Sequence, residues 1–110
     1  MIFVTGPLFS GKKTYLKQRF GWSEEELMAK AALDVQNLVT GSETPAQLAA
    51  LAERLAERPA VTAAEVGGGV VPIDKAQRAQ REAAGRLSIL LAEKAAEAVR
   101  VFCGLPTKLK

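Results

Sequence analysis

The residues whose types and spacing suggest chemistry lie near the start of the chain, where Gly6, Gly11 and Lys12 form a Gly-x4-Gly-Lys pattern. This pattern is the core of a phosphate-binding loop. The first glycine allows a tight turn, the second lets backbone N–H groups close round an anion, and the lysine adds a positive charge. The alternative is a glycine-rich turn with a purely structural role. The phosphate-binding interpretation predicts a nucleotide site made by Gly6, Pro7, Leu8, Phe9, Ser10, Gly11, Lys12, Lys13 and Thr14.

Lys13 departs from the full pattern of such a loop. The residue after the lysine is normally Ser or Thr, whose hydroxyl binds Mg²⁺. Thr14 is turned by about 100° round the following helix, so we do not expect its hydroxyl to replace the missing one. Lys13 as a second cation favours phosphate binding, but the missing hydroxyl puts magnesium-dependent phosphoryl transfer in doubt. We therefore expect a preference for a multiply charged phosphate without magnesium.

Asp34 and Glu65 are the acids that we expect to act with Lys12. Two structures remain open for residues 29–37: a continued helix, or a short buried strand at 31–35 that would bring Asp34 beside the loop. In the strand alternative Asp34 is a candidate metal ligand, because a phosphate-bound metal finds its carboxylate at that place. In the helix alternative Asp34 is a solvated residue. As catalytic candidates, Lys12 would stabilise the transferring phosphoryl group, and Asp34 or Glu65 would hold a metal or orient a hydroxyl.

Strand and helix signals alternate along the chain. Apolar runs predict strands, N-capping residues predict helix starts, and Gly or Pro ends several elements. Alternation of this kind predicts an α/β fold with a mainly parallel sheet, helices on both faces and a C-terminal antiparallel edge hairpin, of the P-loop nucleotide-binding type. The strands are expected at 2–4, 60–64, 98–103 and 107–109, and the helices at 14–20, from 24, from 45 and at 75–95.

Composition limits the classes of function. The 110 residues, 48% of them hydrophobic, suit one domain spanning 1–110. A net charge of +3 with mixed signs does not require a nucleic-acid face, and the absence of a long apolar run predicts no membrane span. No signal peptide precedes the loop. The single cysteine, Cys103, cannot form an internal disulfide, and we expect its side chain to be buried in the core. Both observations lead us to expect a cytoplasmic protein.

The chain contains no histidine. This excludes acid–base catalysis by histidine, metal binding by histidine and a phosphohistidine or nucleotidyl-histidine intermediate. Three consecutive glycines at 67–69, just after the strand at 60–64, suggest a backbone that passes close to a ligand or to a neighbouring loop.

Three segments resemble the adenosylcobinamide kinase/adenosylcobinamide-phosphate guanylyltransferase family of cobalamin biosynthesis. They are residues 4–6 with 10–12, residues 65–72, and the last part of the chain with Arg78, Arg81, Gly85, Arg86, Gly104 and Lys108 to Lys110. The resemblance implies a nucleotide-binding α/β fold, ATP or GTP as ligand, cobinamide as substrate and a homotrimer. These segments cover about half of the chain.

The chain also departs from the family. It is much shorter, and the missing part, before residue 60, is where the family carries its guanylylated histidine. Ala64 stands where an Asn is expected, and Lys13 where a Ser is expected. Guanylyl transfer through histidine is therefore excluded. Two classes remain: an ATP- or GTP-dependent kinase for cobinamide or a related alcohol, and a non-catalytic homologue that binds nucleotide or phosphate and acts through a protein partner.

Overall fold

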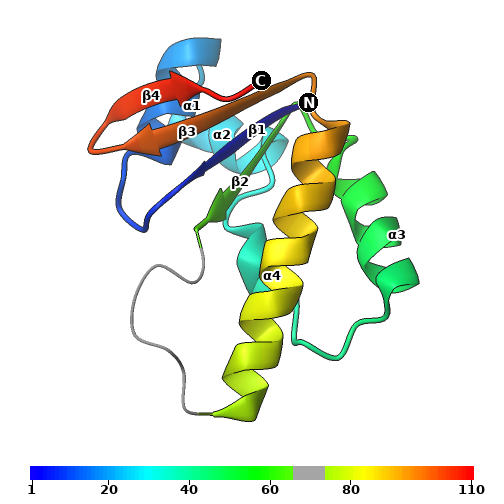
Figure 1. Cartoon of the computed structure of the whole chain (residues 1–110). Helices are drawn as coiled ribbons and strands as arrows, with labels where there is room; N and C mark the ends of the chain where they lie inside the picture. Colours follow the sequence, from blue (N-terminus) through cyan, green and yellow to red (C-terminus); the bar gives the residue numbers. More distant parts are fainter. Residues whose placement is uncertain (66–73) are drawn as a thin grey trace.

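A sheet of four strands lies at the centre of the computed structural model, which describes residues 1–65 and 74–110. The central strand β1 pairs in parallel with β2 and β3, and β3 pairs with β4 in an antiparallel hairpin (Figure 1). The mainly parallel sheet with an antiparallel edge is thus confirmed. In the spatial order β2-β1-β3-β4, the strands are β1 (Ile2–Gly6), β2 (Ala60–Ala64), β3 (Glu97–Phe102) and β4 (Leu105–Lys108). The glycines at 67–69 lie outside the described residues.

Helices cover both faces of the sheet, as the alternation of elements predicts (Figure 1). One face carries α1 (Lys12–Phe20) and α2 (Glu24–Lys30). The other carries the 3₁₀ helix η1 (Val35–Leu38), α3 (Pro45–Leu55) and α4 (Lys75–Lys94). No helix in the described ranges 1–65 and 74–110 is long and apolar enough to cross a lipid bilayer.

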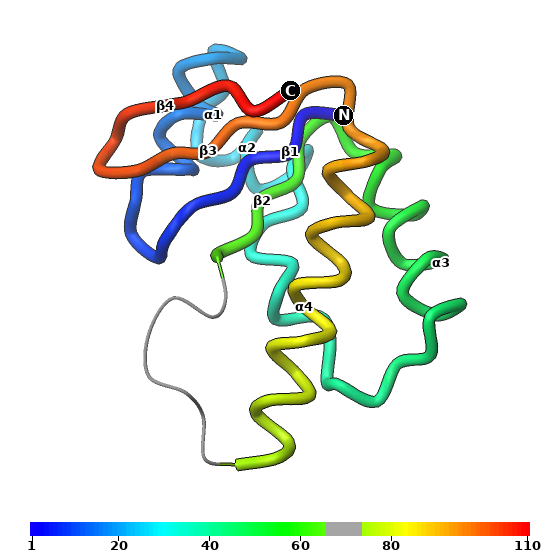
Figure 2. The backbone as a smooth tube through the Cα atoms, viewed as in Figure 1, coloured from blue at the N-terminus to red at the C-terminus, as the bar shows by residue number. Residues whose placement is uncertain are grey.

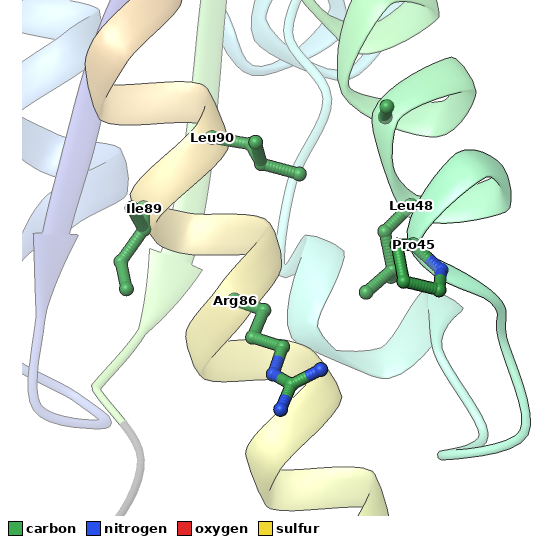
Figure 3. A pocket seen from close by; sticks show the side chains of 6 residues that line it. Pro45, Leu48, Arg86, Ile89 and Leu90 are labelled. Atoms are coloured by element: carbon green, nitrogen blue, oxygen red, sulfur yellow. The ribbon is translucent and has the colours of Figure 1, made fainter.

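Helices α3 and α4 lie side by side and leave an apolar hollow of about 260 Å³ between them. Leu48 of α3 and Leu90 of α4 extend toward each other across it (Figure 3). This hollow shares no residue with the loop after β1, so it belongs to the packing of the two helices. It is lined by Pro45, Leu48, Ala49, Arg86, Ile89 and Leu90.

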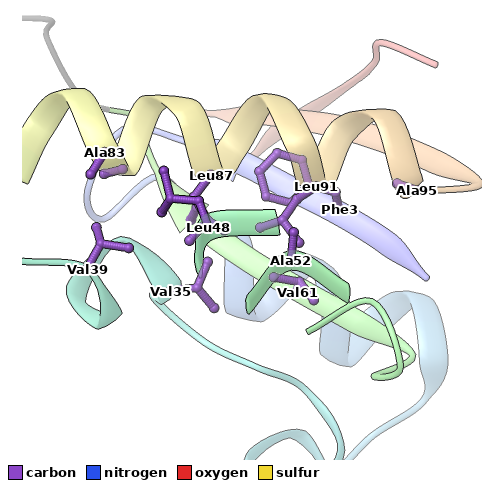
Figure 4. Close-up of a cluster of buried hydrophobic side chains, with 12 residues drawn as sticks. Phe3, Val35, Val39, Leu48, Ala52, Val61, Ala83, Leu87, Leu91 and Ala95 are labelled. Atoms are coloured by element: carbon purple, nitrogen blue, oxygen red, sulfur yellow. The ribbon is translucent and has the colours of Figure 1, made fainter. Parts of the chain in front are cut away.

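The larger core lies between the sheet and the α3–α4 face (Figure 4). Phe3 of β1 and Val61 of β2, which are paired in the sheet, contribute buried side chains to it, and Leu87 and Leu91 of α4 pack against them. Alternate residues of the same strands point the other way, so Val4 packs in the second core with α1 and α2. Burial of each large apolar side chain stabilises the fold by about 1.5–3 kcal/mol. The two cores together fix the sheet that carries the loop.

The predicted starts of α2 and α3 are confirmed at the atomic level, whereas α1 begins at Lys12, two residues before its predicted start. The Ser23 side chain accepts from the N–H of Glu26 at 3.2 Å, and the Ser23 N–H donates to the Glu26 carboxylate at 3.3 Å. Thr44 and Gln47 make the same reciprocal pair before α3. Each pair satisfies N–H groups that a helix cannot satisfy itself, so the starts of α2 and α3 are set by local chemistry.

Neither of the two structures considered for residues 29–37 is correct. Helix α2 ends at Lys30, and Ala32 then makes an isolated parallel bridge with Val61. The N–H of Ala32 donates to Ala60 at 3.0 Å, and its carbonyl accepts from Thr62 at 2.8 Å. Pairing with the edge of β2 overrides the helical propensity of the alanines. Asp34 follows this bridge, as the strand alternative required, but residues 31–35 do not form a full strand.

Cys103 is exposed, so the expectation that it is buried is wrong. It lies in the turn between β3 and β4 with a φ of 51°, in the left-handed region. The apolar run predicts a strand through residue 103, but β3 ends at Phe102 and the next residue turns outward.

Candidate functional site

The glycine loop joins β1 to α1 at the carboxyl end of the central strand (Figure 2). Gly11 caps α1 in a left-handed conformation with a φ of 97°. The carbonyl of Ser10 accepts from the N–H of Gly104 at 2.8 Å, which ties the loop to the β3–β4 turn. The first N–H groups of α1, which a helix leaves unpaired, therefore lie at the loop, as an anion site requires.

Lys12 is buried inside this loop, with 6% of its surface exposed. Its ammonium donates to the carbonyl of Pro7 at 2.7 Å and to that of Gly6 at 3.3 Å. Burial lowers the pKa of the Lys12 ammonium below the ordinary lysine value, while the carboxylates of Asp34 and Glu65 oppose that shift. The site thus holds a cation in a partly desolvated place, where an anion would gain most from it.

Lys13 points toward the acid that the sequence singled out. Its ammonium lies 3.8 Å from the Asp34 carboxylate, and both side chains are partly exposed, at 51% and 37%. The backbone N–H of Asp34 donates to the hydroxyl of Thr62, a fully buried residue of β2, at 2.9 Å. The acid at the end of the Ala32 bridge is therefore fixed beside the loop.

These groups line one hollow of about 470 Å³, a size typical of ligand sites. Seven of the nine residues predicted to bind the nucleotide contribute to it, and Asp34 does so as well. Sequence reasoning missed three others, Gln36, Asn37 and Thr62, although a threonine inside an apolar strand was a usable signal. The complete lining is Leu8, Phe9, Ser10, Gly11, Lys12, Lys13, Thr14, Asp34, Gln36, Asn37 and Thr62.

A strand–loop–helix unit with a buried lysine, facing an acid from the neighbouring edge of the sheet, is consistent with a fold of the P-loop type. A sequence model of the cobinamide kinase / cobinamide phosphate guanyltransferase family matches residues 21–109. The chain belongs to this family. The match covers Asp34 and Glu65 but begins after the glycine loop. The interpretation of that loop as a phosphate site therefore depends on its own sequence and geometry. A comparison with curated proteins gave no match.

Glu65 lies at the same end of the sheet but is engaged elsewhere. The Arg100 guanidinium of β3 donates to both oxygens of its carboxylate, through Nε to Oε1 and through Nη2 to Oε2 at 3.1 Å. This pairing raises the pKa of Arg100. The Glu65 N–H donates to Gly6 at 2.9 Å, so in this cobinamide kinase relative the residue also fixes the start of the loop.

A second hollow of about 350 Å³ flanks the loop on the side of the β3–β4 turn. It shares Phe9, Ser10, Gly11 and Thr14 with the first hollow. None of the described residues that line it is charged, in contrast to the first hollow. The other lining residues are Tyr15, Gln18, Cys103, Gly104 and Pro106.

Two neighbouring loop residues, Phe9 and Ser10, have an exposure or a hydrogen-bonding state that the packing does not explain. Phe9 is fully exposed and has a φ of 58°, a conformation that costs a bulky residue about 1–2 kcal/mol. The Ser10 hydroxyl is buried and has no hydrogen-bond partner among the described residues. A buried hydroxyl of this kind normally has a partner. Because Ser10 lines both hollows, a ligand there could accept its hydrogen bond.

Proposed function

We propose that the chain is a P-loop nucleotide-binding member of the cobinamide kinase family that does not transfer a guanylyl group through histidine. The observation that carries the proposal is the buried Lys12 ammonium inside the glycine loop. A buried cation costs free energy unless an anion or several acceptors surround it. Two backbone carbonyls alone give it partial compensation, and a phosphate would complete it.

The two hollows differ in the charge of their lining residues, and each suits a different part of a nucleotide. The hollow with Lys12 and Lys13 suits the phosphates, and the uncharged one suits the nucleoside, whose base needs an apolar contact and a few hydrogen-bonding groups. The Gln18 amide can donate to and accept from a base edge. The loop residues shared by both hollows would then lie under the link between the two parts.

In a kinase reaction the same hollow would also receive the alcohol. Lys12 would stabilise the charge of the transferring phosphoryl group, and Asp34 would orient the hydroxyl or take its proton. Glu65 is less suited to that role, because Arg100 holds both oxygens of its carboxylate. Asp34 is therefore the better candidate of the two acids.

A second function, nucleotide binding without catalysis, is favoured by one observation. Both candidate acids face cations, Asp34 facing Lys13 and Glu65 facing Arg100. A carboxylate that faces a cation in this way must leave that contact before it can orient a substrate hydroxyl. In this alternative the chain holds nucleotide or phosphate and acts through a protein partner.

Calorimetric titration with ATP, GTP and pyrophosphate tests the binding proposal. We expect all three to bind, and we expect Gln18→Leu to weaken the nucleotides several-fold while leaving pyrophosphate unchanged. A chain that binds none of the three contradicts the proposal. Incubation with γ-labelled ATP and cobinamide then separates the two functions, since labelled cobinamide phosphate forms only if the chain is a kinase.

A further inference from the structure

The residues of the charged hollow do not fit a magnesium ion. Mg²⁺ requires a nearly octahedral set of oxygen ligands, normally one or two carboxylates, a hydroxyl, phosphates and water. The hydroxyl position of the loop carries Lys13, and among the described residues Asp34 supplies the one carboxylate that lines the hollow. In residues 1–65 and 74–110 there is also no cluster of three or more His, Cys, Asp or Glu side chains that could hold a metal.

The two positions that would ligate the metal face each other as an ion pair. Lys13 follows the loop lysine, and Asp34 ends the bridge beside β2, with 3.8 Å between ammonium and carboxylate. We propose that the Lys13 ammonium, which Asp34 holds only loosely, neutralises the phosphates in place of a metal, so that the site takes a metal-free di- or triphosphate. This inference rests on the proposed function of the loop.

The Lys13–Asp34 pair is loose enough for such an exchange. Both side chains are partly exposed, and a separation of 3.8 Å is long for a charge-assisted hydrogen bond. Exposed pairs of this kind contribute little to stability, because water and salt screen them. A polyphosphate with several charges can therefore draw the ammonium toward itself without a large cost to the fold.

Mutation of Asp34 should change the phosphate affinity in opposite directions in a metal-free site and in a metal site. With a metal, loss of the Asp34 carboxylate would remove a ligand and weaken binding. Without one, Asp34 is a negative charge beside the phosphates, so Asp34→Asn should strengthen binding. Lys13→Ser should weaken metal-free binding, and it restores the hydroxyl of the ordinary loop.

Pyrophosphate is the probe, titrated calorimetrically in EDTA and in excess Mg²⁺. We expect the wild-type chain to bind metal-free pyrophosphate at least about threefold more tightly than its magnesium complex. Lys13→Ser should weaken the metal-free affinity by about tenfold and should make the magnesium complex bind more tightly than metal-free pyrophosphate. Asp34→Asn should strengthen the metal-free affinity by about threefold. Lys17 and Glu24 form the matched control pair, with 2.8 Å between their charges and neither residue lining the hollow. Lys17→Ser and Glu24→Gln should leave both affinities unchanged.

The outcomes separate the two proposals. If no pyrophosphate binds under any condition, both the proposed function and this inference are wrong. If wild type binds and magnesium tightens the binding, the proposed function stands and the inference is overturned. A weaker affinity of Asp34→Asn in excess Mg²⁺ would also overturn it, because that is the behaviour of a metal ligand.

Discussion

The Lys12 ammonium lies 2.7 Å from the carbonyl oxygen of Pro7, so the loop lysine is bonded to its own loop. The same ammonium also reaches Gly6 at 3.3 Å. This arrangement holds the cation at the start of α1, where the helix N-terminus adds its own positive potential. It makes the loop a preorganised place for an anion.

Replacing Lys12 separates binding from folding. We expect Lys12→Met to weaken pyrophosphate binding by at least about 100-fold, because a charge-assisted contact in a partly desolvated site is removed. The thermal unfolding midpoint should not fall below that of wild type, since a buried cation is replaced by an apolar chain of similar length. Calorimetry and thermal melts of both proteins check this. A variant that still binds pyrophosphate normally would show that Lys12 is structural.

The pH dependence of binding should reflect the lowered pKa of Lys12. Its ammonium loses the proton at a lower pH than an ordinary lysine, so ATP affinity should fall as pH rises through that lowered pKa. ATP suits the test because its terminal phosphate, with a pKa of about 6, is fully ionised above about pH 8. The part of the decline due to Lys12 should disappear in Lys12→Met.

The stability of the free chain should respond to pH with the opposite sign. Between the lowered pKa of folded Lys12 and its ordinary value in the unfolded chain, the unfolded chain binds more protons, so stability rises with pH. Denaturant unfolding of wild type and Lys12→Met at several pH values measures this difference. A wild-type stability that falls relative to the variant over this window would contradict the burial of the ammonium.

Gly6 is required by the backbone of β3. A side chain there would place its Cβ 2.1 Å from the Val101 carbonyl oxygen, and its φ is 152°. We expect Gly6→Ala to destabilise the chain by about 2–4 kcal/mol in denaturant unfolding. Gly21→Ala is the matched control, with a φ of 68° and no described atom within 4 Å of the added Cβ, so it should cost about 1 kcal/mol. Equal losses in the two variants would show that contact with Val101 is unimportant.

No covalent guanylyl intermediate should form. The chain has no histidine to carry one, although guanyltransferase activity is part of the family description. Incubation with GTP, denaturation and intact mass measurement should show the unmodified mass. An added GMP on a lysine or on Cys103 would mean that another nucleophile has replaced the histidine.

The sequence predicted features that depend on local chemistry. The reciprocal capping of Ser23 and Glu26, the apolar strand β2 and the glycine loop each depend on residues close in the chain, and each was found where expected. The bridge at Ala32 depends instead on a partner 29 residues away, Val61, so propensity alone could not predict it. Gln36 was missed for the same reason, since the fold alone brings it to the loop, whereas Thr62 carried a local signal as a threonine inside an apolar strand.

The central claim is that the loop between β1 and α1 binds an anion, and amide hydrogen exchange tests it most directly. Exchange is followed in peptides covering residues 7–14, with α3 as the internal control, in the presence and absence of saturating pyrophosphate. The account predicts slower exchange at residues 7–14, where N–H groups would bond to phosphate, and no change in α3. Unchanged exchange at residues 7–14 with saturating pyrophosphate, ATP and GTP would contradict it and leave the loop as a structural turn.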